Sequence, residues 1–141
     1  MSYCYEYPRP SVTVDILVYT EIESRPKEVL LIRRGQAPYA GMWALPGGFV
    51  DMDEDLPQAA ERELAEETGL VGLRLRQFRT YGTPGRDPRG RTISIIYTAS
   101  SEMLTVRGGD DASEAAWFDI TKLPRLAFDH SLIIQDWLQS R

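Results

Sequence analysis

Three glutamates near the middle of the chain have the spacing of one helix face. Glu66 and Glu67 follow Glu63 by three and four residues, so a helix would place all three carboxylates about one turn apart on the same side. Like charges at this spacing repel each other, and a hard divalent cation such as Mg²⁺, which prefers oxygen ligands, would neutralise them. The alternative is a solvated acidic surface with arginine counter-charges.

Residues around these glutamates favour the metal site. Gly47 and Gly48 lie upstream and allow the backbone to approach a ligand closely, so a carbonyl oxygen of this turn could complete a metal shell. Arg62 can reach Glu66 at i+4 or Glu54 across the turn, and its planar guanidinium group would fix the orientation of a carboxylate.

The helix that carries the glutamates has clear start and stop signals. Asp55 is a suitable N-cap, and Pro57 suits the first turn. Residues 58–68 are rich in strong helix formers, and Gly69 can take the left-handed conformation that ends a helix. We therefore expect a helix over residues 58–68.

Most other elements are expected to be strands. A polar turn is expected over residues 21–27, and Pro46, Gly47 and Gly48 are expected to interrupt strand pairing. A C-terminal helix is predicted over residues 129–139, with Asp129 as its cap. Apolar and β-branched runs predict strands over residues 12–19, 29–32, 43–50, 73–81, 92–99 and 116–118. Strands outnumber helices, which predicts an α+β sandwich.

Length and composition limit the class of protein. The chain has 141 residues, 43% of them hydrophobic, which predicts a single domain spanning residues 1–141. The net charge of −5 argues against a protein that coats nucleic acid. No apolar run approaches the roughly 20 residues that span a membrane, and the first residues do not resemble a signal peptide. With one cysteine and no zinc-binding cluster, we expect a cytoplasmic protein.

Residues 48–70 contain a specific motif. They read GFVDMDEDLPQAAERELAEETGL, which resembles the Nudix box of the Nudix hydrolases, Gx5Ex7REUxEExGU, where U is aliphatic. The fixed positions all match, and they are Gly48, Glu54, Arg62, Glu63, Leu64, Glu66, Glu67, Gly69 and Leu70. The resemblance implies an α/β/α sandwich with a mixed β-sheet and a catalytic loop-helix-loop on one face. It also implies cleavage of a nucleoside diphosphate linked to another group, X.

The resemblance assigns roles to the residues of this motif. It makes Glu63, Glu66 and Glu67 ligands of Mg²⁺ or Mn²⁺, with the carbonyl of Gly48 as a further ligand. Arg62 and Glu54 become the ion pair that orients them. These roles agree with the chemistry, because attack of water on a pyrophosphate requires the negative oxygens to be neutralised and the water to become more acidic.

The loop over residues 83–91 points to the substrate. It holds Arg86, Arg89 and Arg91 together with two prolines, and guanidinium groups suit bidentate contacts with phosphate. The alternative is that Arg86, Asp87 and Arg89 pair with one another and fasten a hairpin. The stretch resembles the ADP-ribose pyrophosphatases of archaea and bacteria, which implies hydrolysis of ADP-ribose to AMP and ribose 5-phosphate.

Several further residues are candidates for the substrate site. Arg33 and Arg34 follow a strand and could contact phosphate, with simple solvent exposure as the alternative. Tyr39 is one of the aromatic residues that could stack on adenine, although a buried aromatic residue is more often part of the core. The attacking water must lose a proton, and the candidate bases are Glu63 and Glu114. We favour Glu114, because residues 108–114 form an acidic segment that begins with two glycines as a hinge, and the strand that follows would hold Glu114 near the site.

Other interpretations remain open. The N-terminal segment also resembles Nudix-type regulators of NAD metabolism, so a non-catalytic sensor of a NAD-derived nucleotide is one alternative. A hydrolase that removes modified nucleoside triphosphates is another. Those regulators carry a DNA-binding winged helix that we do not expect here, and the net charge is acidic, so nucleic acid is not an expected partner. Membranes are not expected partners either, because the sequence has no apolar run of spanning length. Family members often dimerise, which raises a homodimer as an expectation. His130, the only histidine, is expected to be a structural hydrogen-bonding residue.

Overall fold

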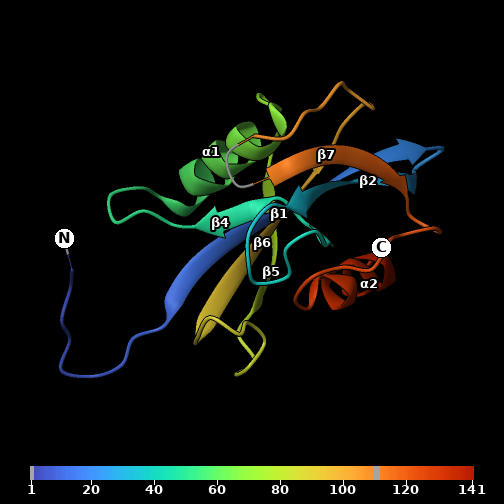
Figure 1. Ribbon diagram of the computed structural model, residues 1–141. Helices are drawn as coiled ribbons and strands as arrows, with labels where there is room; N and C mark the ends of the chain where they lie inside the picture. The colour runs from blue at the N-terminus through green and yellow to red at the C-terminus, as the bar shows by residue number, and fades with distance from the viewer. Residues whose placement is uncertain (1, 110–111) are drawn as a thin grey trace.

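A seven-stranded mixed β-sheet lies between two helices (Figure 1). The computed structural model describes residues 2–109 and 112–141. The elements are β1 (Ser11–Ile22), β2 (Arg25–Arg34), β3 (Trp43–Ala44), β4 (Gly47–Phe49), α1 (Leu56–Thr68), β5 (Arg76–Tyr81), β6 (Thr92–Ser100), β7 (Ala112–Asp119) and α2 (His130–Gln139). This architecture confirms the predicted α+β sandwich.

The sheet is built around β1. One edge of β1 pairs with β6 in parallel over residues 11–19. Its other edge pairs antiparallel with β2 in the second half of the strand and with β4 in the first half, over residues 13–15. β2 in turn pairs with β7 along one edge and with β1 and β3 along the other. β1 and β2 therefore diverge, and the chain that leads to α1 fills the gap between them.

Alternating side chains of β1 supply both faces of the core. Val14, Ile16 and Val18 are fully buried and belong to the cluster that packs against Ala60 and Leu64 of α1. Leu17 points to the other face, where the cluster includes the apolar residues of α2. The strict alternation of β1 thus fixes the two helices on opposite faces of the sheet, as Figure 1 shows.

α1 follows the sequence signals closely. The carboxylate of Asp55 accepts a hydrogen bond from the Leu56 N–H at 2.8 Å, and the Gln58 side chain accepts one from the Asp55 N–H, which completes a capping box. Gly69 ends the helix with a φ of 80°. The prediction of this helix and its caps is confirmed. Among the described residues, no helix is long and apolar enough to cross a lipid bilayer.

The predicted cap of α2 is wrong in one respect. Asp129 occupies the N-cap position, but its carboxylate makes no capping hydrogen bond. It instead accepts two hydrogen bonds from the Arg86 guanidinium, at 2.8 and 2.9 Å. A bidentate guanidinium–carboxylate pair joins two opposite charges through two hydrogen bonds, whereas a cap joins the carboxylate to an uncharged N–H, so the distant arginine is the preferred partner of this carboxylate.

The expectation that Pro46, Gly47 and Gly48 interrupt strand pairing is confirmed at Pro46, which separates β3 from β4, and is wrong for the two glycines. Gly47 and Gly48 form β4 and pair with Asp15 and Val14 of β1. A Cβ on Gly47 would lie 2.2 Å from both the Asp15 Oδ1 atom and the Val14 carbonyl oxygen. Glycine is therefore needed here because two strands approach each other closely, and not because the chain turns.

Two strand boundaries also differ from the prediction. The turn expected over residues 21–27 is confined to Glu23 and Ser24, which adopt φ angles of 53° and 65°. β7 is longer than the predicted residues 116–118, because it pairs with β2 from Glu28 to Arg34. In both places pairing with a neighbouring strand extends a strand into polar sequence, locally in the β1–β2 hairpin and over a long sequence distance between β2 and β7.

Replacing Gly47 by alanine should destabilise the protein strongly. The added Cβ would overlap backbone atoms of β1 that cannot move without breaking the sheet, so we expect the free energy of unfolding to fall by about 2 kcal/mol or more. Gly82→Ala is the matched control, because its Cβ would meet only the Ile93 side chain at 3.7 Å. Urea unfolding of both variants measures the difference. Equal stability of the two would contradict the steric argument.

Candidate active site

Helix α1 presents its glutamates to the glycine strand β4. The Glu63 carboxylate lies so close to Gly48 that a Cβ there would be 2.4–2.6 Å from the three carboxylate atoms. The peptide of Gly48 and the Glu63 carboxylate therefore share one small space. Because Gly48 has no side chain, the Glu63 carboxylate can lie directly against its backbone, and a larger residue at this position would clash with that carboxylate.

Arg62 organises the carboxylates around it. Its guanidinium group donates two hydrogen bonds to Glu54, one to Glu63 at 2.8 Å and one to Glu66 at 3.2 Å. It also donates to the carbonyl oxygen of Phe49 at 3.1 Å, which ties α1 to β4. Arg62 holds the pKa of Glu54 at about 2, and Glu54 and Glu63 raise the pKa of Arg62 in return. The geometry thus contains both arginine contacts that the sequence allowed.

Glu67 is the most buried of the three glutamates. The residue is only 6% exposed, and its Oε1 atom accepts a hydrogen bond from the Gly47 N–H at 2.7 Å. Burial raises the pKa of Glu67 to about 8, although the Gly47 N–H and the charge of Arg34 act in the opposite direction. A cation close to this carboxylate would favour its ionised form.

The donor set suits a hard divalent cation. Glu63, Glu66, Glu67 and the Gly48 carbonyl offer only oxygen atoms, which Mg²⁺ and Mn²⁺ prefer. Within the part of the chain that the structure describes, however, no three acidic, histidine or cysteine side chains gather into a closed metal cluster. Arg62 bonds to Glu63 and Glu66, while the Gly47 N–H bonds to Glu67, so the carboxylates face different partners. The oxygen donors and the close approach of Glu63 to the Gly48 backbone together fit a hard divalent cation.

An open cleft of about 420 Å³ covers these carboxylates, and a smaller cavity of about 50 Å³ adjoins it. The cleft is lined by residues 47–49, the α1 glutamates and Arg62. The cavity reaches the α2 side of the sheet, where Asp15 and His130 lie. Five residues line both spaces, and they are Arg34, Gly47, Gly48, Glu67 and Arg89. The two spaces therefore lie next to each other on either side of these shared residues.

Two of the predicted substrate arginines border this site. Arg34 donates to the Pro38 carbonyl oxygen at 2.7 Å, and its guanidinium lies 5.0 Å from the Phe128 ring centroid. Arg89 lies over the rings of both Phe49 and Phe128, at 4.8 and 5.2 Å. Both arginines thus join a rim of positive charge and aromatic surface.

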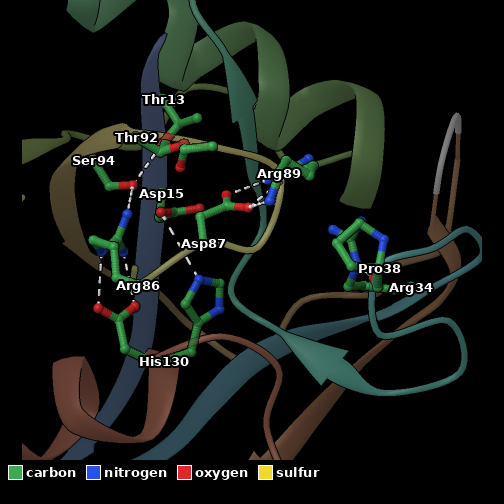
Figure 2. A network of polar contacts seen from close by, with 12 residues as sticks. Thr13, Asp15, Arg34, Pro38, Arg86, Asp87, Arg89, Thr92, Ser94 and His130 are labelled. Atoms are coloured by element: carbon green, nitrogen blue, oxygen red, sulfur yellow. Dashed lines mark hydrogen bonds and ion pairs between the residues drawn. The ribbon is translucent and has the colours of Figure 1, made fainter. Parts of the chain in front are cut away.

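The third arginine, Arg86, is buried beside the inner cavity. Its guanidinium is held by Asp129 and also donates to the Ser94 hydroxyl at 2.6 Å (Figure 2). Asp87 accepts two side-chain hydrogen bonds from Arg89, so the pairing within the loop that the sequence left open does occur for these two residues. Arg86 is instead anchored to the start of α2, which fastens the loop to the helix.

The other candidates lie apart from the cleft. Arg33 forms an ion pair with Glu114 at 3.1 Å, and neither residue lines the cleft or the cavity. Tyr39 packs edge-on against Phe128, with ring centroids 4.9 Å apart. Asp110 and Asp111 of the predicted acidic loop lie outside the described residues.

Sequence reasoning missed Phe49, Phe128 and Asp15. Phe49 and Phe128 flank Arg89, and nothing in the local sequence pattern distinguishes them from core residues. Asp15 did carry a signal, because it is the only charged residue within the apolar run of residues 12–18. A charged group in a buried strand requires a specific partner. Burial raises the pKa of Asp15 to about 7, and the charge of Arg86 opposes this shift.

Comparison with known proteins gives consistent matches. A family model described as NUDIX domain matches residues 9–137. An ADP-ribose pyrophosphatase from Methanocaldococcus jannaschii is 41% identical over 133 residues, which are 94% of this chain and 76% of that protein. An ADPR responsive transcriptional repressor from Acinetobacter baylyi is 35% identical over 92% of this chain, which spans only 54% of the repressor.

A solved structure extends the match to the fold. The NUDIX domain of Shewanella oneidensis NrtR, in a cocrystal structure with ADP ribose, superimposes with a TM-score of 0.84. The alignment covers 95% of this chain and 90% of that chain at 34% identity.

The Arg62–Glu54 pair should appear in the pH dependence of stability. The pKa of Glu54 falls from 4.5 in the unfolded chain to about 2 in the fold, so its stabilising contribution is complete above pH 4.5 and is lost as the pH falls toward 2. We expect the free energy of unfolding of wild type to be larger than that of Glu54→Gln by a constant amount above pH 5. Below pH 5 this difference should shrink. Urea titrations between pH 3 and 8 measure this gap. A gap that widens on acidification would contradict the assignment.

Proposed function

The chain belongs to the NUDIX family, and we propose that it is a divalent-metal-dependent pyrophosphohydrolase that cleaves ADP-ribose to AMP and ribose 5-phosphate. The observation that carries this proposal is the contact between the α1 carboxylates and the glycine strand β4 at the floor of an open cleft. The similarity to an ADP-ribose pyrophosphatase over 94% of the chain supports the choice of substrate.

Gly48 and the charged fixed residues of the motif have proposed roles. Glu63, Glu66, Glu67 and the Gly48 carbonyl would hold Mg²⁺ or Mn²⁺. When bound, the cation neutralises charge on the diphosphate and increases the acidity of the attacking water. Arg62 and Glu54 orient the carboxylates, because the Arg62 guanidinium contacts Glu63 and Glu66 while Glu54 holds its other edge.

The rim of the cleft supplies the proposed substrate contacts. Arg34 and Arg89 border both the cleft and the inner cavity, and both can contact the diphosphate. Phe49 and Phe128 offer aromatic surface for adenine beside them, and Tyr39 supports Phe128. Arg86 contributes by holding the loop to α2. Arg33 would not contact the substrate directly and would act on the site through its ion pair with Glu114.

The geometry supports Glu63 over Glu114 as the general base. Glu63 lies at the cleft against Gly48, within the space that the reacting diphosphate would occupy. Glu114 is paired with Arg33 and does not line the cleft. To accept a proton there, Glu114 would have to leave that arginine.

A sensor is the second candidate, because the chain is also similar to a repressor that responds to ADPR. The complete set of acidic residues in α1 supports catalysis instead. A protein that only binds the nucleotide gains nothing from adjacent carboxylates that repel each other.

A cytoplasmic location and a homodimer are further proposals, which the lone cysteine and the family resemblance support. Light scattering on the purified protein measures the oligomeric state.

Product analysis tests the proposed reaction directly. The protein is incubated with Mg²⁺ and with ADP-ribose, NADH, diadenosine polyphosphates, nucleotide sugars or nucleoside triphosphates, and the products are separated by chromatography. We expect AMP to form fastest from ADP-ribose, and EDTA to stop the reaction. Binding of ADP-ribose without products would identify a sensor, and pyrophosphate released from a triphosphate would identify a different hydrolase.

Removing one charge from the proposed metal site should abolish turnover. We expect Glu66→Gln and Glu67→Gln to lower kcat by about 100-fold or more, because each loses an anionic oxygen that would hold the cation. Glu61→Gln, on an exposed part of the same helix, is the control and should retain full activity. Calorimetric titration should show weaker binding of Mn²⁺ to Glu66→Gln and Glu67→Gln, and unchanged binding to Glu61→Gln. Full activity in both would refute the metal assignment.

The role of Glu114 can be separated from that of Glu63. We expect Glu114→Gln to retain kcat within about threefold, and Glu63→Gln to lose most activity. Steady-state kinetics with ADP-ribose measure both variants. A large loss of kcat in Glu114→Gln, with a shifted pH profile, would return the role of the base to Glu114.

A further inference from the structure

Asp15 is a buried acid whose carboxylate has no hydrogen-bond partner among the described residues. The residue is 8% exposed and lines the inner cavity of about 50 Å³. The nearest group of opposite polarity is the His130 Nε2 atom, 3.9 Å from Oδ2, which exceeds hydrogen-bond distance. Among the described residues no fully buried side-chain oxygen or nitrogen atom lacks a hydrogen-bond partner, so the unpaired Asp15 oxygens open onto this cavity, where a ligand can bind them.

His130 presents a donor to the same space. Its Nδ1 atom accepts a hydrogen bond from the Leu45 N–H at 2.9 Å, so this nitrogen carries no proton. The proton of the neutral imidazole must therefore be on Nε2, the atom that faces Asp15. Burial lowers the pKa of His130 to about 4, which agrees with a neutral ring. The structural role expected for His130 is met at Nδ1, and Nε2–H remains available for a ligand.

The surrounding polar groups are already occupied. Arg86 is held by Asp129 and Ser94, and Asp87 is held by Arg89. The Thr13 hydroxyl pairs with the Ser94 hydroxyl. Figure 2 shows these contacts around Asp15 and His130. Asp15 and Nε2–H of His130 thus have hydrogen-bonding capacity to spare, in addition to the arginines assigned to the diphosphate.

An acceptor and a donor side by side favour a neutral group that can both donate and accept a hydrogen bond. A phosphate would be repelled by the Asp15 carboxylate, and a metal ion would be repelled by the Nε2–H dipole. A hydroxyl group can donate to Asp15 and accept from His130 at the same time. A cavity of about 50 Å³ has room for such a group, or for a water molecule in its place.

The location of the cavity identifies the molecule that would carry this hydroxyl. The cavity shares Arg34, Gly47, Gly48, Glu67 and Arg89 with the cleft that holds the proposed diphosphate site. These shared residues place the cavity beside the proposed diphosphate site, within reach of a group attached to the diphosphate. We propose that Asp15 and His130 form a subsite that binds a hydroxyl group of a ribose of the substrate, an inference that rests on the proposed function.

Calorimetry with the two products tests the subsite without catalysis. Ribose 5-phosphate and AMP are titrated separately into wild type, Asp15→Asn and the control Asp53→Asn, in EDTA at pH 8 where Asp15 is ionised. Loss of a hydrogen bond to a charged group weakens binding by about 10- to 100-fold. We expect this loss in Asp15→Asn for one product only, which identifies the terminal ribose or the adenosine ribose as the source. Asp53 is exposed, so its variant should bind both products like wild type.

Kinetics with a matched substrate provide the second arm. ADP-ribose is compared with an ADP ester that carries a simple alkyl group without hydroxyls. If the terminal ribose is bound, Asp15→Asn lowers kcat/KM for ADP-ribose about 10-fold or more and leaves the ester unaffected. If the adenosine ribose is bound, both substrates lose equally, in agreement with the AMP titration. The melting temperature of Asp15→Asn should stay near that of wild type, because the Asp15 carboxylate makes no hydrogen bond to lose.

The outcomes separate this inference from the proposed function. Unchanged binding of both products and unchanged kinetics in Asp15→Asn would overturn the subsite and assign the cavity to water alone. A lowered melting temperature with equal weakening for every ligand would also overturn it, because that pattern describes a structural role. If wild type fails to hydrolyse ADP-ribose but product binding still depends on Asp15, the proposed function fails and the subsite stands.

Discussion

The close approach of β4 to both β1 and α1 is the constraint on which the site depends. Gly47 lies against Asp15 and Val14 of β1, and Gly48 lies against the Glu63 carboxylate of α1. The Gly47 N–H also binds the buried Glu67 carboxylate. One pair of residues without side chains therefore sets the distance between the sheet and the acidic helix. Any Cβ there would push apart the groups that the proposed chemistry brings together.

Charge balance around this contact is achieved by arginines from different parts of the chain. Arg62 bonds to Glu54, Glu63 and Glu66 on the α1 side. On the other side, Arg86 bonds to Asp129 and Arg89 to Asp87. Because these pairs are bidentate or shared among several carboxylates, they position side chains as well as neutralise them. The cleft therefore has an acidic floor and a basic, aromatic rim, which suits a cation below a diphosphate.

The inner cavity shows how the two faces of the sheet cooperate. Asp15 extends from β1 toward the α2 face, while Val14 and Ile16 beside it pack under α1. His130 comes from the first turn of α2 and supports Leu45, which leads directly into β4. The same histidine thus links the last helix to the glycine strand. Packing on the α2 face and geometry on the α1 face are consequently not independent of each other.

The local sequence determined the parts of this protein that depend on neighbours along the chain. The capping residues and period of α1 predicted that helix, the Nudix motif predicted its glutamates and the Arg62–Glu54 pair, and the alternation of β1 predicted a buried strand. Tertiary structure alone decided that Gly47 and Gly48 are a paired strand, that Asp129 binds Arg86 instead of capping α2, and that Asp15 meets His130. These contacts join residues 32 to 115 positions apart. Their partners are chosen by long-range pairing and burial, which no local propensity encodes.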